Sequence, residues 1–265
     1  MRRYGVLFVV LLSLSACSTV PITGRSQLNL IPGSSMMSMS LQEYDKFLKE
    51  HKVSTNVEQT AAVKRVGANT QRAVERYFAS SGLSGHLKDY KWEFNLVEDK
   101  QVNAWCMPGG KVVVYTGLLP VARDDAGLAV VMGHEIAHAI AEHGNERMSQ
   151  ALLAQMGGVA LSTALSTQTA ATQQLWMSVY GVGAQYGAIM PYSRLQESEA
   201  DQLGLVFMTM AGYDPNEALA FWERMAAQKG GKAPPEFLST HPSDATRIEN
   251  IRRLIPHVKR DYQTR

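Results

Sequence analysis

The segment "VVMGHEIAHAIAEHG", residues 130–144, constrains this chain more than any other part of it. Its apolar composition predicts a buried helix. His134 and His138 are four residues apart, so they lie one turn apart on one helix face and can both point at one metal ion. Glu135 lies about 100° further round the helix, where its carboxylate can reach a water on that ion without binding the ion itself. Two histidines that only share a helix are the alternative.

A row of small side chains runs along the same helix. Gly133, Ala137 and Ala141 follow one another at four-residue spacing, so they occupy one side of the helix. Small side chains allow two helices to approach closely, and the row therefore predicts that another helix packs there.

A zinc site needs at least one further protein ligand. Gly144 stands where an extended motif would place a third histidine, and His143 points away from His138, as is typical of a surface or end-of-helix histidine. Glu197 and Asp201 in "ESEAD" share a helix face. Glu197 can bind zinc while Asp201 accepts a hydrogen bond from a ligand imidazole. An ordinary acidic helix start is the alternative interpretation of this pair.

Composition excludes some classes of protein and favours one folded body. The chain has 265 residues, of which 45% are hydrophobic and 19% charged, which suits a single globular domain. The formal net charge of +2 is too small to indicate a nucleic-acid partner. The basic residues between 252 and 260 are interpreted as a solvated face.

The N-terminus has the layout of an export signal. Arg2 and Arg3 precede an apolar stretch, residues 5–16, and "LSAC" then ends at Cys17. This layout resembles a bacterial lipobox, in which the cysteine is lipidated, and a lipid anchor replaces a membrane-spanning helix. A plain secretory signal is the alternative. Cys106 is then the single cysteine of the mature chain, so no internal disulfide is expected.

The pattern of apolar residues predicts helices and a small sheet. Helices are expected over 41–52, 57–80 and most of the chain after residue 128. Strands are expected over 90–97, 102–107 and 111–117, with "PGG" as a turn between the last two. This order predicts an α+β fold, mostly helical, with a small mixed or antiparallel sheet next to the helix that carries the histidines.

One region stands apart because it carries no charge. Residues 148–193 contain no Asp, Glu, Lys, Arg or His. Gln, Ser and Thr recur through it, which favours a helical hairpin with a mobile loop at 162–174 over insertion into a membrane. Membrane insertion stays open as the alternative.

Four stretches together resemble the HtpX-like family of zinc metallopeptidases, which also contains the CAAX prenyl proteases. They are "NAWCMPGGKVVVYTGLL", "HEIAH", "SRLQESEAD" and "STHPSDATRI". The periplasmic lipoprotein branch is the most similar. The resemblance implies a zincin-like domain over 41–265, after a signal peptide at 1–16 and a lipidated tether at 17–40.

The resemblance also implies roles for individual residues. It implies one zinc ion held by His134, His138 and Glu197, with Glu135 as general base and acid, Asp201 and Arg247 as supporting residues, and His241 as an extra ligand or oxyanion stabiliser. An extended substrate would pair with a sheet edge, which either 102–107 or 111–115 could supply. Asn103, Ala104 and Trp105 are then candidate substrate-binding residues. The pair Trp105-Cys106 departs from the family pattern and could narrow a substrate pocket.

These expectations lead to a function and a rival. The chain is expected to be a zinc metalloendopeptidase anchored through Cys17 to the periplasmic face of the outer membrane of a Gram-negative cell. Unfolded or misassembled envelope proteins would be its substrates, in protein quality control, and the loop at 162–174 would gate the cleft. The rival is a non-catalytic or latent zinc-binding, chaperone-like lipoprotein. The sequence leaves the oligomeric state open.

Overall fold

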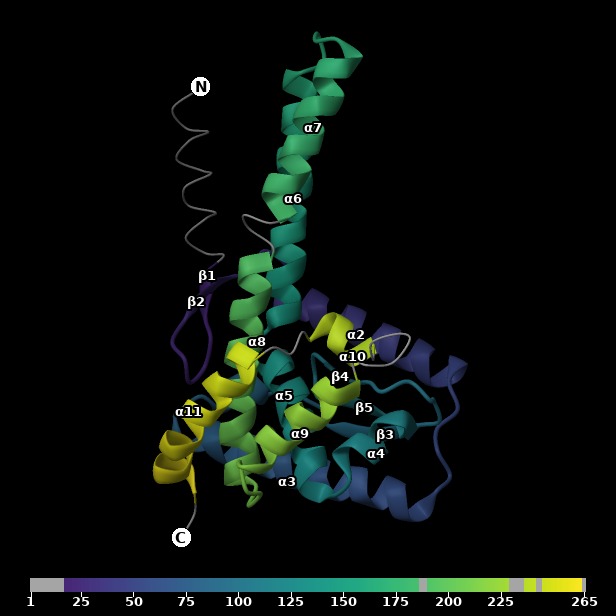
Figure 1. The fold of residues 1–265 in the computed structure, drawn as a ribbon, viewed down its shortest axis with the longest axis vertical. Helices are drawn as coiled ribbons and strands as arrows, with labels where there is room; N and C mark the ends of the chain where they lie inside the picture. The colour runs from purple at the N-terminus through teal and green to yellow at the C-terminus, as the bar shows by residue number, and fades with distance from the viewer. Residues whose placement is uncertain (1–16, 186–189, 229–235, 242–244, 264–265) are drawn as a thin grey trace. The chain divides into compact units, whose positions relative to one another are not determined.

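The structure is a computed structural model, and it describes residues 17–185, 190–228, 236–241 and 245–263. The chain divides into two compact units (Figure 1). One comprises residues 37–140 and 197–265, and we call it the sheet unit. The other comprises residues 1–36 and 141–196, and we call it the hairpin unit.

A three-stranded mixed sheet forms the centre of the sheet unit. Its order is β3 (Glu93–Val97), β5 (Lys111–Tyr115), β4 (Ala104–Met107), with β3 parallel and β4 antiparallel to β5. All five residues of the central β5 are buried, as its β-branched run predicts. The turn between β4 and β5 uses Gly109 and Gly110 at φ +88° and +79°, a conformation that favours glycine.

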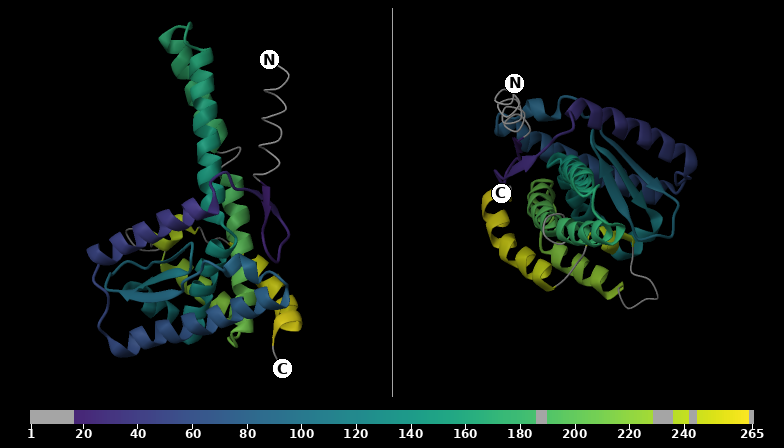
Figure 2. Two further views of the ribbon diagram at one scale, coloured as in Figure 1. Left: turned by 180° about the vertical axis from the view of Figure 1, so that it is seen from behind. Right: turned by 90° about the horizontal axis from the view of Figure 1, so that it is seen from above.

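Helices cover both faces of this sheet. They are α2 (Gly33–Glu50), α3 (Val57–Ser80) and α5 (Asp125–Ile140). Val113 and Tyr115 pack against Tyr44 of α2, while the alternate side chains of β5 face α3 and α5. Gly67 of α3 lies against the Phe94 ring of β3. Figure 2 (left) shows the strands between α2 and α3.

The remaining elements of the sheet unit are mostly helical, as expected. They are η1 (Ser84–Leu87), η2 (Thr116–Leu118), α4 (Leu119–Ala122), the C-terminal part of α8 (Met190–Met210), α9 (Glu217–Ala227), α10 (Glu236–Thr240) and α11 (Ala245–Tyr262). α8 ends before Gly212, which has φ +92° and closes the helix as a left-handed residue. The order of elements confirms the predicted α+β, mostly helical class.

The hairpin unit contains β1 (Cys17–Thr19), β2 (Ser26–Leu28), α6 (His143–Ala164) and α7 (Ala170–Ala184). β1 and β2 pair antiparallel. Arg25 forms an ion pair of 2.7 Å with Glu146 near the start of α6, and the backbone N–H of Leu30 donates to Ser149 Oγ at 2.8 Å. Residues 17–40 therefore contain two strands and the first turns of α2, where the sequence predicted a tether.

The uncharged region folds as the predicted hairpin, but its loop is shorter. α6 continues to Ala164 and Thr169 caps α7 by accepting from the Thr172 N–H at 3.3 Å. The loop expected at 162–174 therefore spans only residues 165–169, because the Ser, Thr and Gln residues on either side extend and cap the two helices. Among the helices that the structure describes, none has both the length and the apolar character needed to cross a membrane.

Candidate metal centre

The helix that carries the histidines is buried along nearly its whole length. Every residue of α5 from Gly127 to Ile140 is buried. The Asp124 carboxylate accepts from the Gly127 N–H at 2.9 Å, which satisfies one free donor at the start of the helix. Burial on all sides explains why this segment is apolar except for His134, Glu135 and His138. Three polar side chains at one buried place require a chemical reason.

α5 and α8 approach each other at a pair of glycines. A Cβ added to Gly133 would lie 3.1 Å from the Gly204 carbonyl oxygen, and one added to Gly204 would lie 2.9 Å from the His134 nitrogen. The predicted close packing of a second helix is confirmed at Gly133. This contact places the part of α8 that belongs to the sheet unit, from Glu197 on, next to His134.

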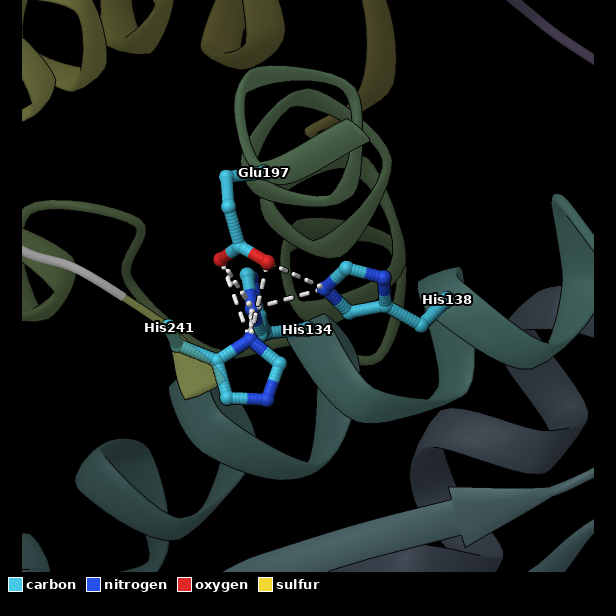
Figure 3. Close-up of side chains that lie close together, drawn as sticks. All are labelled: His134, His138, Glu197 and His241. Atoms are coloured by element: carbon cyan, nitrogen blue, oxygen red, sulfur yellow. Dashed lines mark hydrogen bonds and ion pairs between the residues drawn. The ribbon is translucent and has the colours of Figure 1, made fainter. Parts of the chain in front are cut away.

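Four side chains from three segments converge beside α5 (Figure 3). His134 and His138 come from α5, Glu197 from α8, and His241 follows α10. His241 is held in place because its N–H donates to the Phe237 carbonyl at 2.8 Å. All four side chains are buried. The structure thus brings together the three predicted zinc ligands and His241.

The distances between these side chains suit a metal ion. The nitrogen Nε2 of His134 lies 3.1 Å from His138 Nε2 and 3.2 Å from His241 Nδ1. Glu197 oxygens lie 3.0 Å from His241 Nδ1 and 3.4 Å from Nε2 of both His134 and His138. Tetrahedral zinc with bonds of 2.0–2.1 Å separates its ligand atoms by about 3.3 Å. Three imidazoles and one carboxylate at this spacing fit zinc.

Asp201 and Arg247 contact the four-residue group and hold two of its side chains in position. Asp201 Oδ1 lies 3.1 Å from His134 Nδ1, so it accepts the Nδ1–H and leaves Nε2 facing the group. Arg247 Nε and Nη2 donate to Asp201 at 2.7 and 2.8 Å, and Arg247 Nη1 lies 3.3 Å from Glu197 Oε2. Arg247 therefore positions a ligand carboxylate and the partner of a ligand imidazole, and both expected supporting residues lie at the site.

The electrostatics of the site favour an added cation. Burial alone raises the pKa of Glu197, but hydrogen bonds with His134, His138 and His241 hold it far below its ordinary value. Burial likewise raises the pKa of Asp201, but the charge of Arg247 and hydrogen bonds with His134 and Arg247 together lower it below its ordinary value. For His134, burial lowers the pKa, and hydrogen bonds with Asp201 and Glu197 outweigh burial and raise it. Two buried carboxylates therefore face one permanent cation, and the imbalance suits a divalent metal.

Glu135 stands next to the group without being part of it. The carboxylate is buried and its Oε1 lies 3.4 Å from His241 Nε2. His241 thus presents Nδ1 to the other three side chains and Nε2 to Glu135. Glu135 is thus close to the four-residue group without being one of its members.

Two aromatic residues that sequence reasoning did not single out form the wall of the site. The Arg247 guanidinium lies 3.5 Å from the ring centre of Trp222 in α9, and the Phe237 ring lies tilted against that of His241 with ring centres 4.6 Å apart. Trp222 follows an ordinary amphipathic pattern, and Phe237 lies in none of the motifs that the sequence offered. Their rings thus pack directly against Arg247 and His241.

The candidate substrate residues lie around the edge strand β4. Ala104 is buried and its N–H donates to Asn103 Oδ1 at 2.9 Å. Trp105 faces the α2 side of the sheet, with its ring 4.9 Å from that of Phe47. The neighbouring Cys106 faces α5 instead, and burial, with the charge of Glu135, raises the pKa of its thiol.

His143 belongs to the hairpin unit rather than to the metal group. It begins α6 and is fully buried, so the expectation of a surface histidine is wrong, although it does stand at a helix end. The four-residue group among the described residues consists of His134, His138, Glu197 and His241.

A small mixed sheet beside a buried His-Glu-x-x-His helix, with a later carboxylate completing the ligand set, defines a zinc metallopeptidase. Known proteins agree with this class. The sequence pattern of peptidase family M48 matches residues 65–255. This chain therefore belongs to peptidase family M48, a family of zinc metallopeptidases, and the expected resemblance is confirmed at the level of the family.

Its relatives come from mitochondria and from bacteria. The mitochondrial metalloendopeptidase OMA1 of Schizosaccharomyces pombe is 34% identical over 91% of this chain and 68% of its own length. The mitochondrial metalloendopeptidase OMA1 of Bos taurus is 32% identical over 100% of this chain and 50% of its own length. A putative beta-barrel assembly-enhancing protease of Vibrio cholerae is 32% identical over 64% of this chain and 37% of its own length. The chain thus spans between about a third and two thirds of these relatives.

Proposed function

We propose that this chain is a zinc metalloendopeptidase of the bacterial envelope that cleaves unfolded or misassembled envelope proteins. The observation that carries the proposal is the convergence of His134, His138, Glu197 and His241 beside the carboxylate of Glu135. Two kinds of relative support it by their names, the metalloendopeptidases and the beta-barrel assembly-enhancing protease.

The proposed chemistry divides between the metal and the chain. When bound, zinc lowers the pKa of a coordinated water to near neutrality and polarises the scissile carbonyl. Glu135 takes a proton from the attacking water and delivers it to the amide nitrogen that leaves. Asp201 keeps the proton of His134 on Nδ1. Arg247 contacts the carboxylates of both Asp201 and Glu197 and fixes their positions relative to each other.

The edge strand β4 is the proposed platform for the substrate backbone. β5 is the central strand, so of the two expected edges, that at 102–107 lies at the margin of the sheet. An extended peptide added to such an edge gains backbone hydrogen bonds whatever its sequence, which suits a protease for unfolded chains. Asn103 and Ala104 lie at the start of this edge and are the proposed contacts.

The substitution Glu135→Gln tests the chemistry. It keeps the size of the side chain and removes its ability to accept the proton, so casein cleavage should fall by about 10²-fold or more. Zinc content by elemental analysis should stay near one ion per chain. Glu223→Gln, on an exposed part of α9, serves as the matched control with unchanged cleavage. Unchanged cleavage by a zinc-loaded Glu135→Gln chain would refute the mechanism.

A latent form of the same enzyme is the second candidate, and His241 favours it. Its Nδ1 lies at ligand spacing from both His134 and Glu197. Four protein ligands close a zinc site, whereas a catalytic site keeps one position open. We propose that His241 occupies that position until a substrate displaces it. A chain that binds unfolded proteins and never cleaves them would favour the non-catalytic rival.

The location is proposed from the sequence of the N-terminus. Cys17 follows an apolar stretch in a lipobox-like context, and we propose that its lipid anchors the chain at the periplasmic face of the outer membrane. Cys17→Ser should move the protein from the membrane fraction to the soluble fraction of the cell. Cys106→Ser is the matched control and should not. A chain that labels with no fatty acid at Cys17 contradicts the anchor.

A further inference from the structure

The hairpin formed by α6 and α7 has no part in the proposed peptidase chemistry. All of it beyond the first turn of α6 lies within the uncharged region 148–193, and it holds most of the exposed large apolar side chains of the described residues. A helical surface in water is normally polar or charged, and a large exposed apolar surface marks a contact with a partner or a lipid.

The two helices pack through one side each. Tyr180 of α7 donates its hydroxyl to the Ala154 carbonyl of α6 at 2.8 Å, and its ring lies against Gly157 and Gly158. Side chains two positions away from these contact residues are turned by about 160°, so they point out of the hairpin.

Apolar side chains occupy those outward positions on both helices. Met156 and Val159 of α6 are 60% and 63% exposed, and Val182 of α7 is 60% exposed. The same stripes continue along each helix, where the further exposed side chains are Met148, Leu152, Leu175 and Val179. The outward sides of both helices are thus apolar. A single flat partner surface would cover only one of these sides, whereas a surrounding apolar medium would cover both.

Positive charges mark the base of the hairpin. Arg147 precedes the uncharged region and Arg194 follows it, and both are exposed. They lie at one level, because their neighbours Glu146 and Gln196 are joined by a hydrogen bond of 2.8 Å. Two arginines at the boundary of an apolar element are complementary to the phosphates of lipid headgroups. The part of α6 beyond Arg147 comprises the 17 residues 148–164 and spans about 26 Å, enough to reach well into a hydrocarbon core of about 30 Å.

The residue after Cys17 is tied to the same base. Asn29 donates to Ser18 Oγ at 2.9 Å and also to the Glu142 carboxylate, directly before α6. The lipid that the proposed function places on Cys17 would therefore enter a membrane beside the hairpin. The shared base gives both elements the same membrane face.

We propose that the α6–α7 hairpin is a lipid-binding element whose apolar outer sides enter the membrane to which the chain is attached. The hairpin enters the membrane from one face and returns to the same face, since both of its ends lie at its base. The location of the anchor rests on the proposed function, but the contact of the hairpin with lipid is measurable without the anchor.

The test places a fluorescent reporter on the hairpin of the full chain. In a Cys17→Ser, Cys106→Ser background, Val179→Cys is labelled with the environment-sensitive dye NBD. Vesicles of phosphatidylethanolamine and phosphatidylglycerol should increase its emission and shift it to the blue. Val57→Cys, on an exposed apolar position of α3 that is 82% exposed, is the matched control and should not respond. No response at position 179 overturns the proposal.

A second set of variants tests the same contact by charge. Leu152→Glu with Val159→Glu should reduce the vesicle response of the position-179 label at least about tenfold, because an ionised side chain in the apolar layer costs more than 1.4 kcal/mol. Val57→Glu should not change it. A dimeric mass, with emission at position 179 already blue-shifted before vesicles are added, would show a second copy as the partner and overturn the lipid assignment.

The outcome is separable from that of the peptidase proposal. The hairpin variants should cleave soluble casein at the unaltered rate, and a Glu135→Gln chain should still respond to vesicles. Failure of vesicle binding with intact cleavage rejects the inference alone, and failure of cleavage with intact vesicle binding rejects the peptidase proposal alone.

Discussion

At the scale of single residues, His241 has two partners on opposite sides of its ring. Nδ1 lies 3.0 Å from Glu197, and Nε2 lies 3.4 Å from Glu135. A neutral imidazole offers one lone pair and one N–H, so a ring whose Nδ1 faces a cation carries its proton on Nε2, the nitrogen nearest to Glu135. The His241 ring then occupies the proposed fourth ligand position of the metal and also stands beside Glu135, the proposed base. In this arrangement a substrate can reach neither the metal nor Glu135.

We expect His241→Ala to increase the rate of casein cleavage and to leave zinc bound by the three remaining ligands. Opening the fourth position admits water, and removing the ring makes room for that water beside the Glu135 carboxylate. The measurements are initial cleavage rate and zinc content on the same sample. His257→Ala, exposed on α11, is the control. A lower cleavage rate with zinc retained would mean that the ring assists the reaction.

The residues that the sequence could predict are those related by helix periodicity. His134, His138 and Glu135 have relative positions that a helix alone determines, and Glu197 and Asp201 are related in the same way. Trp222 and Phe237 could not be predicted, because their contacts with Arg247 and His241 depend on how separate segments pack. Arg247 came from the family resemblance, and only the structure shows that it joins Asp201 to Glu197.

At the scale of elements, the site depends on how closely α5 and α8 approach. Gly133 and Gly204 face each other across the contact, and a Cβ on Gly204 would meet backbone atoms rather than a flexible side chain. Backbone cannot move aside without moving a whole helix. The separation of His134 from Glu197 is therefore set by the absence of two side chains.

Gly204→Ala should lower the free energy of unfolding and weaken zinc binding. Overpacking typically costs about 1–3 kcal/mol, while the better helix propensity of alanine returns up to about 1 kcal/mol. Urea unfolding measures the first effect, and competition with a fluorescent zinc chelator measures the second. Gly85→Ala is the control, since its Cβ would meet nothing within 4 Å. A stabilised chain with unchanged zinc affinity would show that the helices can separate without cost.

Helices and strands could be predicted where the sequence pattern was long. The pairing of the strands in the sheet could not be predicted. The strands at 93–97, 104–107 and 111–115 follow from β-branched and alternating residues. Their order, with β5 in the centre and parallel to β3, depends on the non-local pairing of Glu93–Val97 with Lys111–Tyr115. The loop expected over 162–174 spans only 165–169, because polar uncharged residues are as compatible with exposed helix as with loop.

At the scale of the whole molecule, the proposed metal joins segments that are far apart in the sequence. His134, Glu197 and His241 belong to α5, α8 and the residue after α10. Without a cation, the buried Glu197 and Asp201 share the single charge of Arg247, and burying two carboxylates with one cation between them is costly. Zinc therefore has two effects on the sheet unit, because it links three segments and neutralises the charge that they bring together.

Removing zinc should accordingly lower the melting temperature of the protein. A ligand that binds only the folded chain adds RT ln(1 + [L]/Kd) to its stability, which is about 2.7 kcal/mol at a hundredfold excess over Kd. Calorimetry with and without a chelator measures the shift, and added zinc should reverse it. His138→Ala lacks a ligand, so it should melt lower than the unaltered chain and respond less to the chelator. If the chelator removes the metal and the melting temperature does not change, the three segments are held by packing alone, and zinc serves the chemistry without contributing to the fold.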